Sequence, residues 1–236
     1  MFKTLIRKMV PSESLERFFS LYSMFFKNTH PKYYREHGRH TQLVGPISSC
    51  PQFVEMEDYT RLQAGTRIIS SGGIVRIKKY TAVGADCTFV PGSHVPTVGL
   101  PQFLSITHIN DHQSTITLGE DVWVGTRCTF LEKAQVGRGA VIGACSLVNK
   151  VIPPYAVVVG APARVIAVRF TKEQILKHEA ILYPPEERMK PEELDELFET
   201  VFKDMRSIGV GTLSEEDRVR LNQAKAQYEI PDYENC

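Results

Sequence analysis

The chain has no cysteine pair at Cys-x-x-Cys spacing, no long uninterrupted apolar run and no strong excess of one charge. Three of its five cysteines fall inside the repeat described below, where they fit as small buried side chains, so we expect a reducing compartment. The opening segment MFKTLIRKMV is broken by Arg7 and Lys8 and supports neither a signal peptide nor a membrane span. The net charge of the whole chain is +1, and neither end resembles a nucleic-acid-binding tail. We therefore expect a cytoplasmic protein with no nucleic-acid partner.

A six-residue repeat is the strongest pattern that is present. Every sixth residue is apolar in three blocks: Met56, Leu62 and Ile68; Ile77, Val83 and Phe89; and Leu118, Val124, Phe130, Val136, Ile142 and Val148. Neither an α-helix, with about 3.6 residues per turn, nor a simple strand places every sixth side chain alike. Hexapeptide periodicity is typical of parallel β-helices, in which each coil buries its apolar edge against neighbouring coils.

Two further regularities support this register. The fifth residue of each hexad is small, as a tight corner requires: Thr60, Thr66, Gly72, Thr81, Cys87, Ser93, Val122, Cys128, Ala134, Ala140 and Ser146. Glycine directly follows four of the apolar residues, which indicates an unusual φ or a close backbone approach: Gly119, Gly125, Gly137 and Gly143. We predict an all-β core over residues 51–167, the alternative being a β-sandwich with accidental spacing.

The repeat is interrupted once. Phe89 and Leu118 lie 29 residues apart, which is not a multiple of six, so a loop is inserted over residues 95–115. Inserted segments of this length tend to be functional. His94 stands at the start of this one, in the run FVPGSHVPTVG.

An N-terminal helical segment is predicted over residues 1–50. Apolar residues recur there at helical spacing behind Pro11 and Ser12: Leu15, Phe18, Phe19, Tyr22, Phe25 and Phe26. This aromatic face, with Lys3, Arg7 and Lys8 nearby, would pack on its own domain, pack on a sister subunit or touch a membrane surface. The sequence leaves these alternatives open.

A helical, acidic tail is predicted over residues 168–236. Three prolines and a glycine in VIPPYAVVVGAPARVIA end the coils. Helix starts are then indicated by Thr171 with Gln174, by Pro191, and by Ser214 with Asp217. We expect this tail to serve as a cap or an oligomer contact.

Four segments together resemble the hexapeptide-repeat acyltransferases of the left-handed β-helix fold, in the branch of maltose, galactoside, xenobiotic and polysaccharide O-acetyltransferases. They are the GSH run, LGEDVWVG, VGRGAVIGACSLVNK and VVVGAPARVI. A weaker match, RFTKEQILKHEAILYPPEERM, resembles the helical tail of xenobiotic and capsule-modifying members. The resemblance covers residues 54–190. It implies a left-handed parallel β-helix, a homotrimer, and acetyl-CoA as co-substrate between adjacent prisms.

The resemblance also implies roles for individual residues. A hydroxyl is a poor nucleophile at neutral pH, and the resemblance gives His94 the role of the general base that removes its proton. Trp123 would lie on the acceptor side. The positions that match the surroundings of coenzyme A are Thr126, Ala144, Asn149, Lys150 and Arg164. No resident metal is implied.

The chain departs from the galactoside enzymes at two positions. Ala167 stands where they carry a second arginine, with Arg169 the nearest substitute, and Ala64 stands where they carry an acceptor-binding asparagine. These departures argue against a simple galactoside or maltose acceptor. The helical tail and the missing asparagine together favour a sugar hydroxyl of a polysaccharide, lipopolysaccharide or capsule precursor, reached by at most a peripheral membrane contact. An antibiotic such as chloramphenicol or a streptogramin is the runner-up.

The sequence leaves two other functions open. His94, His108 and His112 could supply three imidazoles to zinc, as in γ-class carbonic anhydrases. The prism could also be a non-catalytic trimeric scaffold, which would bind no acetyl-CoA.

Overall fold

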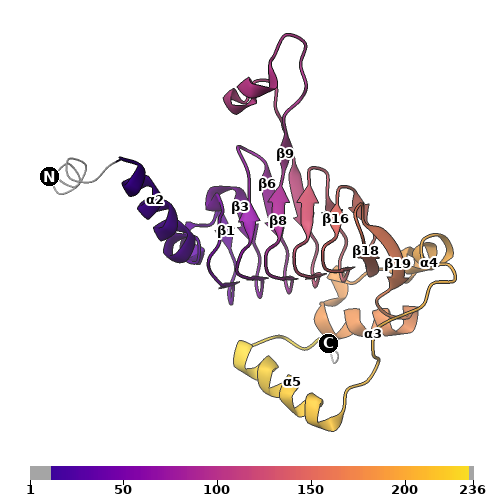
Figure 1. Cartoon of the computed structure of the whole chain (residues 1–236). Coiled ribbons are helices and arrows are strands. Elements are labelled where there is room, and N and C mark those ends of the chain that lie inside the picture. The colour runs from indigo at the N-terminus through magenta and orange to yellow at the C-terminus, as the bar shows by residue number, and fades with distance from the viewer. Residues whose placement is uncertain (1–11, 234–236) are drawn as a thin grey trace.

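The computed structural model describes residues 12–233. Its centre is the predicted left-handed parallel β-helix, a three-faced prism of short strands, with helices at both ends (Figure 1). Successive coils pair in parallel, and the only antiparallel pairs within the described residues are β9 with β10 and β18 with β19. The fold prediction is therefore confirmed.

The three faces of the prism are named A, B and C here. Face A contains β1 (Glu36–His37), β3 (Val54–Met56), β6 (Ile74–Ile77), β11 (Thr115–Leu118), β14 (Gln135–Val136) and β17 (Val151–Ile152). Face B contains β2 (Gln42–Leu43), β4 (Arg61–Leu62), β7 (Ala82–Val83), β12 (Trp123–Val124), β15 (Val141–Ile142), β18 (Ala156–Val159) and β19 (Arg164–Val168). Face C contains β5 (Arg67–Ile68), β8 (Thr88–Val90), β13 (Thr129–Leu131) and β16 (Leu147–Val148).

The apolar repeat positions form the core of the prism. All twelve are at most 3% exposed. Phe89 and Phe130 lie on successive coils of face C, and their rings stack with centroids 4.8 Å apart and planes 6° apart. Since burying one large apolar side chain contributes about 1.5–3 kcal/mol, stacking neighbouring coils supplies most of what holds each coil in place.

The small fifth residues are buried at the corners, except Gly72 and Ser93, which are exposed. The prediction is wrong at these two positions because the coils there are interrupted: Gly72 lies in a bend, and Ser93 belongs to the strand that leaves the prism.

The glycines that follow the apolar residues are explained by close approach. A Cβ at Gly125 would lie 2.6 Å from the backbone nitrogen of Ala144 on the next coil. Of the two predicted alternatives, an unusual φ and a close approach, the close approach applies at these glycines, and the left-handed residue comes two positions later in the turn. Asp121, Arg127 and Cys145 occupy such positions, with φ of 53°, 58° and 61°.

The N-terminal helix begins at Ser12 as α2 (Ser12–Tyr22) and continues into a π-helical turn, η1 (Ser23–Lys27). The buried side chain of Asn28 donates to the carbonyl of Ile47 (2.9 Å), which ties the end of this helix to the prism. Short 3-10 turns follow at η2 (Pro31–Tyr33) and η3 (Pro51–Phe53). Lys3, Arg7 and Lys8 lie outside the described residues.

The C-terminal tail is helical, as predicted, and packs on the prism through one buried carboxylate. Its elements are α3 (Lys172–Leu182), η5 (Pro185–Glu187), α4 (Pro191–Thr200) and α5 (Glu215–Tyr228). All three predicted helix starts are confirmed, including the reciprocal capping box of Thr171 and Gln174. Glu179 of α3 accepts hydrogen bonds from the Tyr155 hydroxyl (2.5 Å) and the Arg138 guanidinium (2.9 Å) of the coils. Within residues 12–233, no helix has the length and apolarity needed to cross a bilayer.

Candidate functional site

A single arm, residues 94–111, projects from the prism where face C meets face A (Figure 1). It leaves through β9 (Gly92–Ser93) and returns through β10 (His112–Gln113), which pair antiparallel with Ser93 opposite His112. Its outer part contains the 3-10 helix η4 (Gln102–Thr107). The inserted loop is therefore a hairpin arm with a two-strand base, and His94 is the first residue beyond that base.

The close approach of β10 to β9 explains why the GSH run begins with a glycine, Gly92. A Cβ at this position would lie 2.9 Å from the carbonyl oxygen of His112 and 2.9 Å from the Gln113 side-chain oxygen. Only glycine lets β10 approach β9 this closely without displacing it. The residue thus sets the base of the arm on which the histidine stands.

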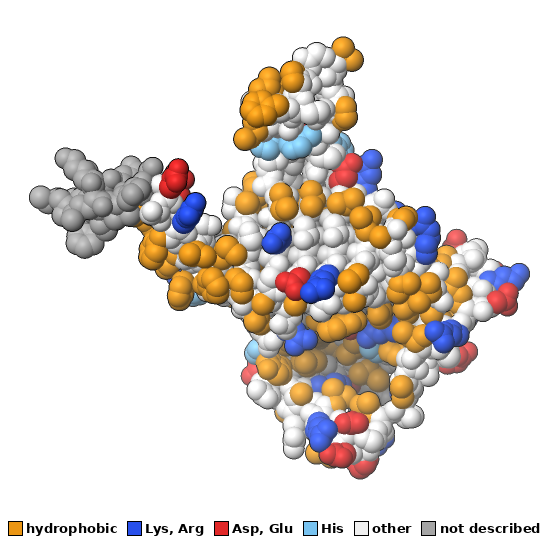
Figure 2. All heavy atoms as spheres, in the orientation of Figure 1, with side chains coloured by type: hydrophobic (Ala, Val, Ile, Leu, Met, Phe, Trp, Pro, Cys, Tyr) orange, Lys and Arg blue, Asp and Glu red, His pale blue; other side chains and the backbone are white. Residues whose placement is uncertain are grey.

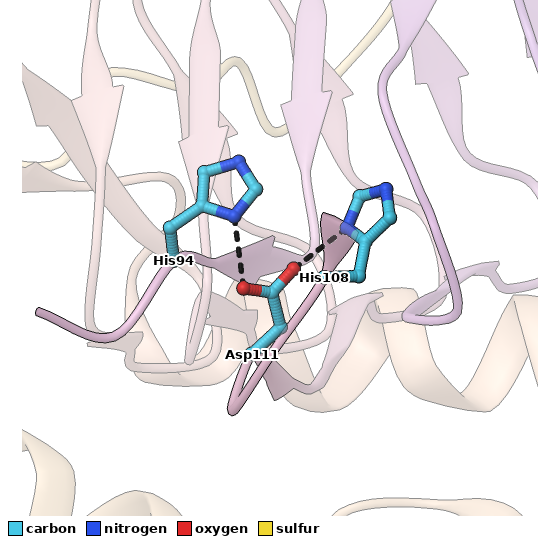
Figure 3. A group of neighbouring side chains, drawn as sticks. All are labelled: His94, His108 and Asp111. Carbon is cyan, nitrogen blue, oxygen red and sulfur yellow. Dashed lines mark hydrogen bonds and ion pairs between the residues drawn. The ribbon is translucent and has the colours of Figure 1, made fainter. Parts of the chain in front are cut away.

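The arm brings two imidazoles onto one carboxylate (Figure 3). Nδ1 of His94 lies 2.8 Å from Oδ1 of Asp111, and Nδ1 of His108 lies 2.7 Å from Oδ2 of the same residue. The Asp111 side chain is 7% exposed, whereas the His94 and His108 side chains are 48% and 50% exposed. The carboxylate is therefore covered by the arm, and both imidazoles remain open to solvent.

The backbone of the arm turns sharply to make this arrangement. His108 and Asn110 both adopt left-handed conformations, with φ of 55° and 57°. Asn110 also donates from its side-chain amide to the Thr97 hydroxyl across the arm (3.0 Å). These two turns bring Asp111 back toward the start of the arm.

The electrostatics favour an ionised carboxylate. Hydrogen bonds from His108 and then from His94 lower the pKa of Asp111, more than its partial burial raises it. A carboxylate only accepts hydrogen bonds, so the Nδ1 atom of each imidazole donates to it. In a neutral ring this leaves Nε2 of His94 unprotonated and available as a base.

A second imidazole–carboxylate pair lies at the base of the arm. Nδ1 of His112 lies 2.7 Å from Oε2 of Glu132, and the Ser93 hydroxyl donates to the same oxygen (3.0 Å). Hydrogen bonds from His112 and then Ser93 lower the pKa of Glu132. This pair fastens β9 and β10 to the coil that follows β13.

The proposed three-imidazole zinc site is not formed within the chain. His112 pairs with Glu132, whereas the group whose donor atoms lie within 4.8 Å of one another is His94, His108 and Asp111. The arm therefore offers two nitrogens and one carboxylate to a cation, which is a different donor set from the one on which the carbonic anhydrase alternative rested.

The predicted acceptor-side and coenzyme positions lie on other parts of the prism surface. Trp123 is on face B and 47% exposed. Thr126 and Ala144 are exposed on successive coils at the corner between faces B and C. Asn149 and Lys150 are exposed at the corner between faces C and A, the corner from which the arm departs.

The two arginines near the exit differ in their surroundings. Arg164 is exposed on β19, and its guanidinium donates to the carbonyl of Ala163 (3.1 Å). Arg169 instead donates to the carboxylate (2.7 Å) and carbonyl (2.9 Å) of Asp121 and to the Gly139 carbonyl (3.1 Å). Arg169 is thus committed to holding the coils together and does not replace the arginine missing at Ala167.

Asp111 and Glu132 were not predicted from the sequence. Asp111 had one usable signal, because it lies three residues after His108 in the inserted segment. Glu132 gave none, since a glutamate in a repeat coil is usually a solvated side chain.

The repeat of the chain matches a known family. Residues 115–150 match the model described as bacterial transferase hexapeptide (six repeats). A chloramphenicol acetyltransferase from Klebsiella aerogenes is 41% identical over 75 residues, which is 32% of this chain and 36% of that protein. The match therefore spans only about a third of that relative's length.

Solved structures share the fold. A galactoside acetyltransferase in complex with coenzyme A superposes with a TM-score of 0.54 at 20% identity, covering 70% of this chain and 84% of the other. A hexapeptide-repeat-containing acetyltransferase from Vibrio cholerae gives a TM-score of 0.52 at 21% identity, covering 58% of this chain and 75% of the other.

Proposed function

We propose that the chain is an O-acetyltransferase that uses acetyl-CoA as co-substrate, with His94 as the general base. Its hexapeptide repeat and its left-handed β-helix, which it shares with bacterial acetyltransferases, support this proposal. The observation that carries the proposal is the His94 Nδ1 to Asp111 Oδ1 hydrogen bond of 2.8 Å, which orients a half-exposed imidazole and leaves its Nε2 free.

The reaction follows from this geometry. Nε2 of His94 takes the proton of the acceptor hydroxyl while the oxygen attacks the thioester carbonyl carbon. As the tetrahedral intermediate collapses, the C–S bond breaks and the imidazolium returns the proton to the departing thiolate of coenzyme A. General base catalysis of this kind contributes about 10²- to 10⁴-fold. Asp111 accepts from Nδ1 throughout, which fixes the tautomer and stabilises the transient imidazolium.

The position of Trp123 supports a site shared between copies of the chain. Trp123 is on face B, whereas His94 stands at the corner between faces C and A. A cleft lined by both residues requires the face of a second chain. We propose the homotrimer expected of such prisms, with acetyl-CoA between adjacent prisms, along the exposed positions of Thr126 and Ala144.

The remaining coenzyme positions lie toward the C-terminal end of the prism, where Ala163 donates its backbone N–H to the Leu147 carbonyl (2.8 Å). Arg164 is exposed near the chain's exit from the coils, where its cation would face the phosphates of coenzyme A. Asn149 and Lys150 lie on the same corner of the prism as the arm, two coils further along.

We propose a sugar hydroxyl of a glycan precursor as the acceptor. Two features support this acceptor: the helical tail after residue 168 resembles that of capsule-modifying members, and Ala64 stands where the galactoside enzymes carry an acceptor-binding asparagine. A second candidate is a small antibiotic, favoured by the 41% identity over 75 residues to a chloramphenicol acetyltransferase. The two are separated by comparing kcat/KM for chloramphenicol with that for free and lipid-linked sugars.

The test is release of coenzyme A from acetyl-CoA, followed with a thiol reagent in the presence of a panel of sugar and antibiotic acceptors. Acceptor-dependent release that is lost in His94→Asn supports the proposal. Calorimetry that detects no acetyl-CoA binding would instead favour the non-catalytic scaffold.

A further inference from the structure

The apolar side of α2 and η1, called the aromatic face here, is left uncovered by the residues that the structure describes. It comprises Phe18, Phe19, Leu21, Tyr22, Phe25 and Phe26, each between 49% and 64% exposed. Figure 2 shows these side chains as a continuous apolar patch at the N-terminal end of the prism. Patches of adjoining large apolar side chains on a surface mark interaction sites.

The aromatic face does not pack on its own domain. α2 leads away from the end of the prism (Figure 1), and its rings contact one another, as in the stacking of Tyr22 on Phe26 with centroids 5.4 Å apart. The end of η1 is nevertheless fixed, because Ile47 donates its backbone N–H to the Met24 carbonyl (3.0 Å) and Asn28 is buried. The face is therefore held in one orientation relative to the coils.

The segment of the sequence that contains the aromatic face has more basic than acidic residues. Residues 1–33 contain two acidic residues, Glu13 and Glu16, against six basic ones: Lys3, Arg7, Lys8, Arg17, Lys27 and Lys32. Among the described residues, Lys27 and Lys32 stand beside the Tyr33 ring, with Nζ 5.6 Å and 5.0 Å from its centroid. An aromatic stripe flanked by cations is the pattern of helices that lie in the interface of anionic membranes.

We infer that the aromatic face docks on an anionic lipid surface, with the helix lying in the interfacial plane. A second copy of the chain is the competing occupant. Self-association would bring the same basic side chains together, whereas an anionic bilayer is complementary to them. The apolar residues also cover adjacent positions around the helix, which suits insertion into a lipid interface better than the narrow seam of a coiled coil. This inference is independent of the acetyl transfer proposed above.

The test is flotation of the full chain with vesicles of phosphatidylcholine alone and with added phosphatidylglycerol. We expect binding to the anionic vesicles that weakens between 0.1 and 0.5 M salt, values chosen to shorten the Debye length from about 10 Å to roughly half of that. Phe18→Ser combined with Phe26→Ser should reduce partitioning about tenfold or more. Lys27→Glu combined with Lys32→Glu should reduce binding to anionic vesicles only.

The matched control is Val210→Ser, which removes an apolar side chain that is 76% exposed in the C-terminal tail. It should bind vesicles like the unsubstituted chain. Circular dichroism and light scattering of every variant verify the fold and the molar mass. Failure of the unsubstituted chain to bind either vesicle overturns the inference. A Phe18→Ser/Phe26→Ser variant that keeps vesicle binding but falls to a lower molar mass overturns it too, and assigns the face to subunit contact.

Discussion

Asp111 and His94 are separated by 17 residues along the chain, yet Oδ1 and Nδ1 lie 2.8 Å apart because the arm turns back on itself. The same carboxylate accepts from His108 through its other oxygen at 2.7 Å. One covered acidic side chain therefore orients two exposed imidazoles, of which His94 is rooted directly in the base of the arm.

The first prediction concerns the base itself. His94→Asn keeps a side chain that can donate to Asp111 but removes the basic nitrogen. We expect kcat to fall about 10²- to 10⁴-fold with little change in thermal unfolding, since the residue is half exposed. Near-normal turnover by this variant refutes the role of His94.

The second prediction distinguishes the role of the His94–Asp111 pair from that of the His112–Glu132 pair. Asp111→Asn should lower kcat about 10- to 100-fold with a smaller effect on KM, because His94 loses its orienting anion. His112→Gln is the matched control, since it alters the neighbouring imidazole–carboxylate pair with Glu132. Equal losses of kcat in both variants would mean that the pairs only stabilise the arm.

The third prediction is a pH profile. The pKa of Asp111 is lowered, so its carboxylate is protonated only below the ordinary aspartate range, about pH 3.9. Above that pH it stays charged, so protonation of Asp111 does not account for a loss of kcat/KM that sets in above this range. The acid limb should therefore persist, at reduced rate, in Asp111→Asn. Its disappearance in that variant would assign the limb to Asp111.

The fourth prediction concerns coil stacking. Gly125→Ala places a Cβ 2.6 Å from the Ala144 backbone nitrogen, so we expect a loss of about 1–3 kcal/mol in the free energy of unfolding. Gly72→Ala is the control, because its Cβ meets only the flexible Gln113 side chain at 3.3 Å. Denaturant unfolding that gives equal stabilities for the two variants contradicts the packing argument.

The fifth prediction tests how the tail is attached. Glu179→Ala leaves the Tyr155 hydroxyl and one side of Arg138 without their buried acceptor, and should cost about 2–4 kcal/mol. Glu186→Ala, at an exposed position of η5, should change stability little. Limited proteolysis should cut within residues 168–233 first in Glu179→Ala; a protease-resistant tail would argue against this anchor.

The prism could be predicted from the sequence because its packing is periodic. Leu118, Val124 and Phe130 recur at the one spacing that a three-faced coil repeats, so the register follows from counting. The helix starts at Thr171 and Pro191 could also be predicted, since capping depends on residues within one turn. The arm could be located because the six-residue count fails between Phe89 and Leu118.

Only the tertiary structure decided which residues form hydrogen bonds with the histidines of the site. The sequence by itself determined the coils, the place of the inserted arm and, through the family resemblance, the candidate base at its start. It did not determine that Asp111 faces His94, or that His112 turns away to Glu132, because these pairs depend on how a non-repeating segment folds back over the prism. It also could not determine that the aromatic face of α2 is left uncovered, since amphipathic spacing is the same whether the partner is the chain itself, a second copy or a lipid surface. Contacts between coils follow a repeat that can be counted along the sequence, whereas these contacts involve a non-repeating segment whose path only the tertiary structure shows.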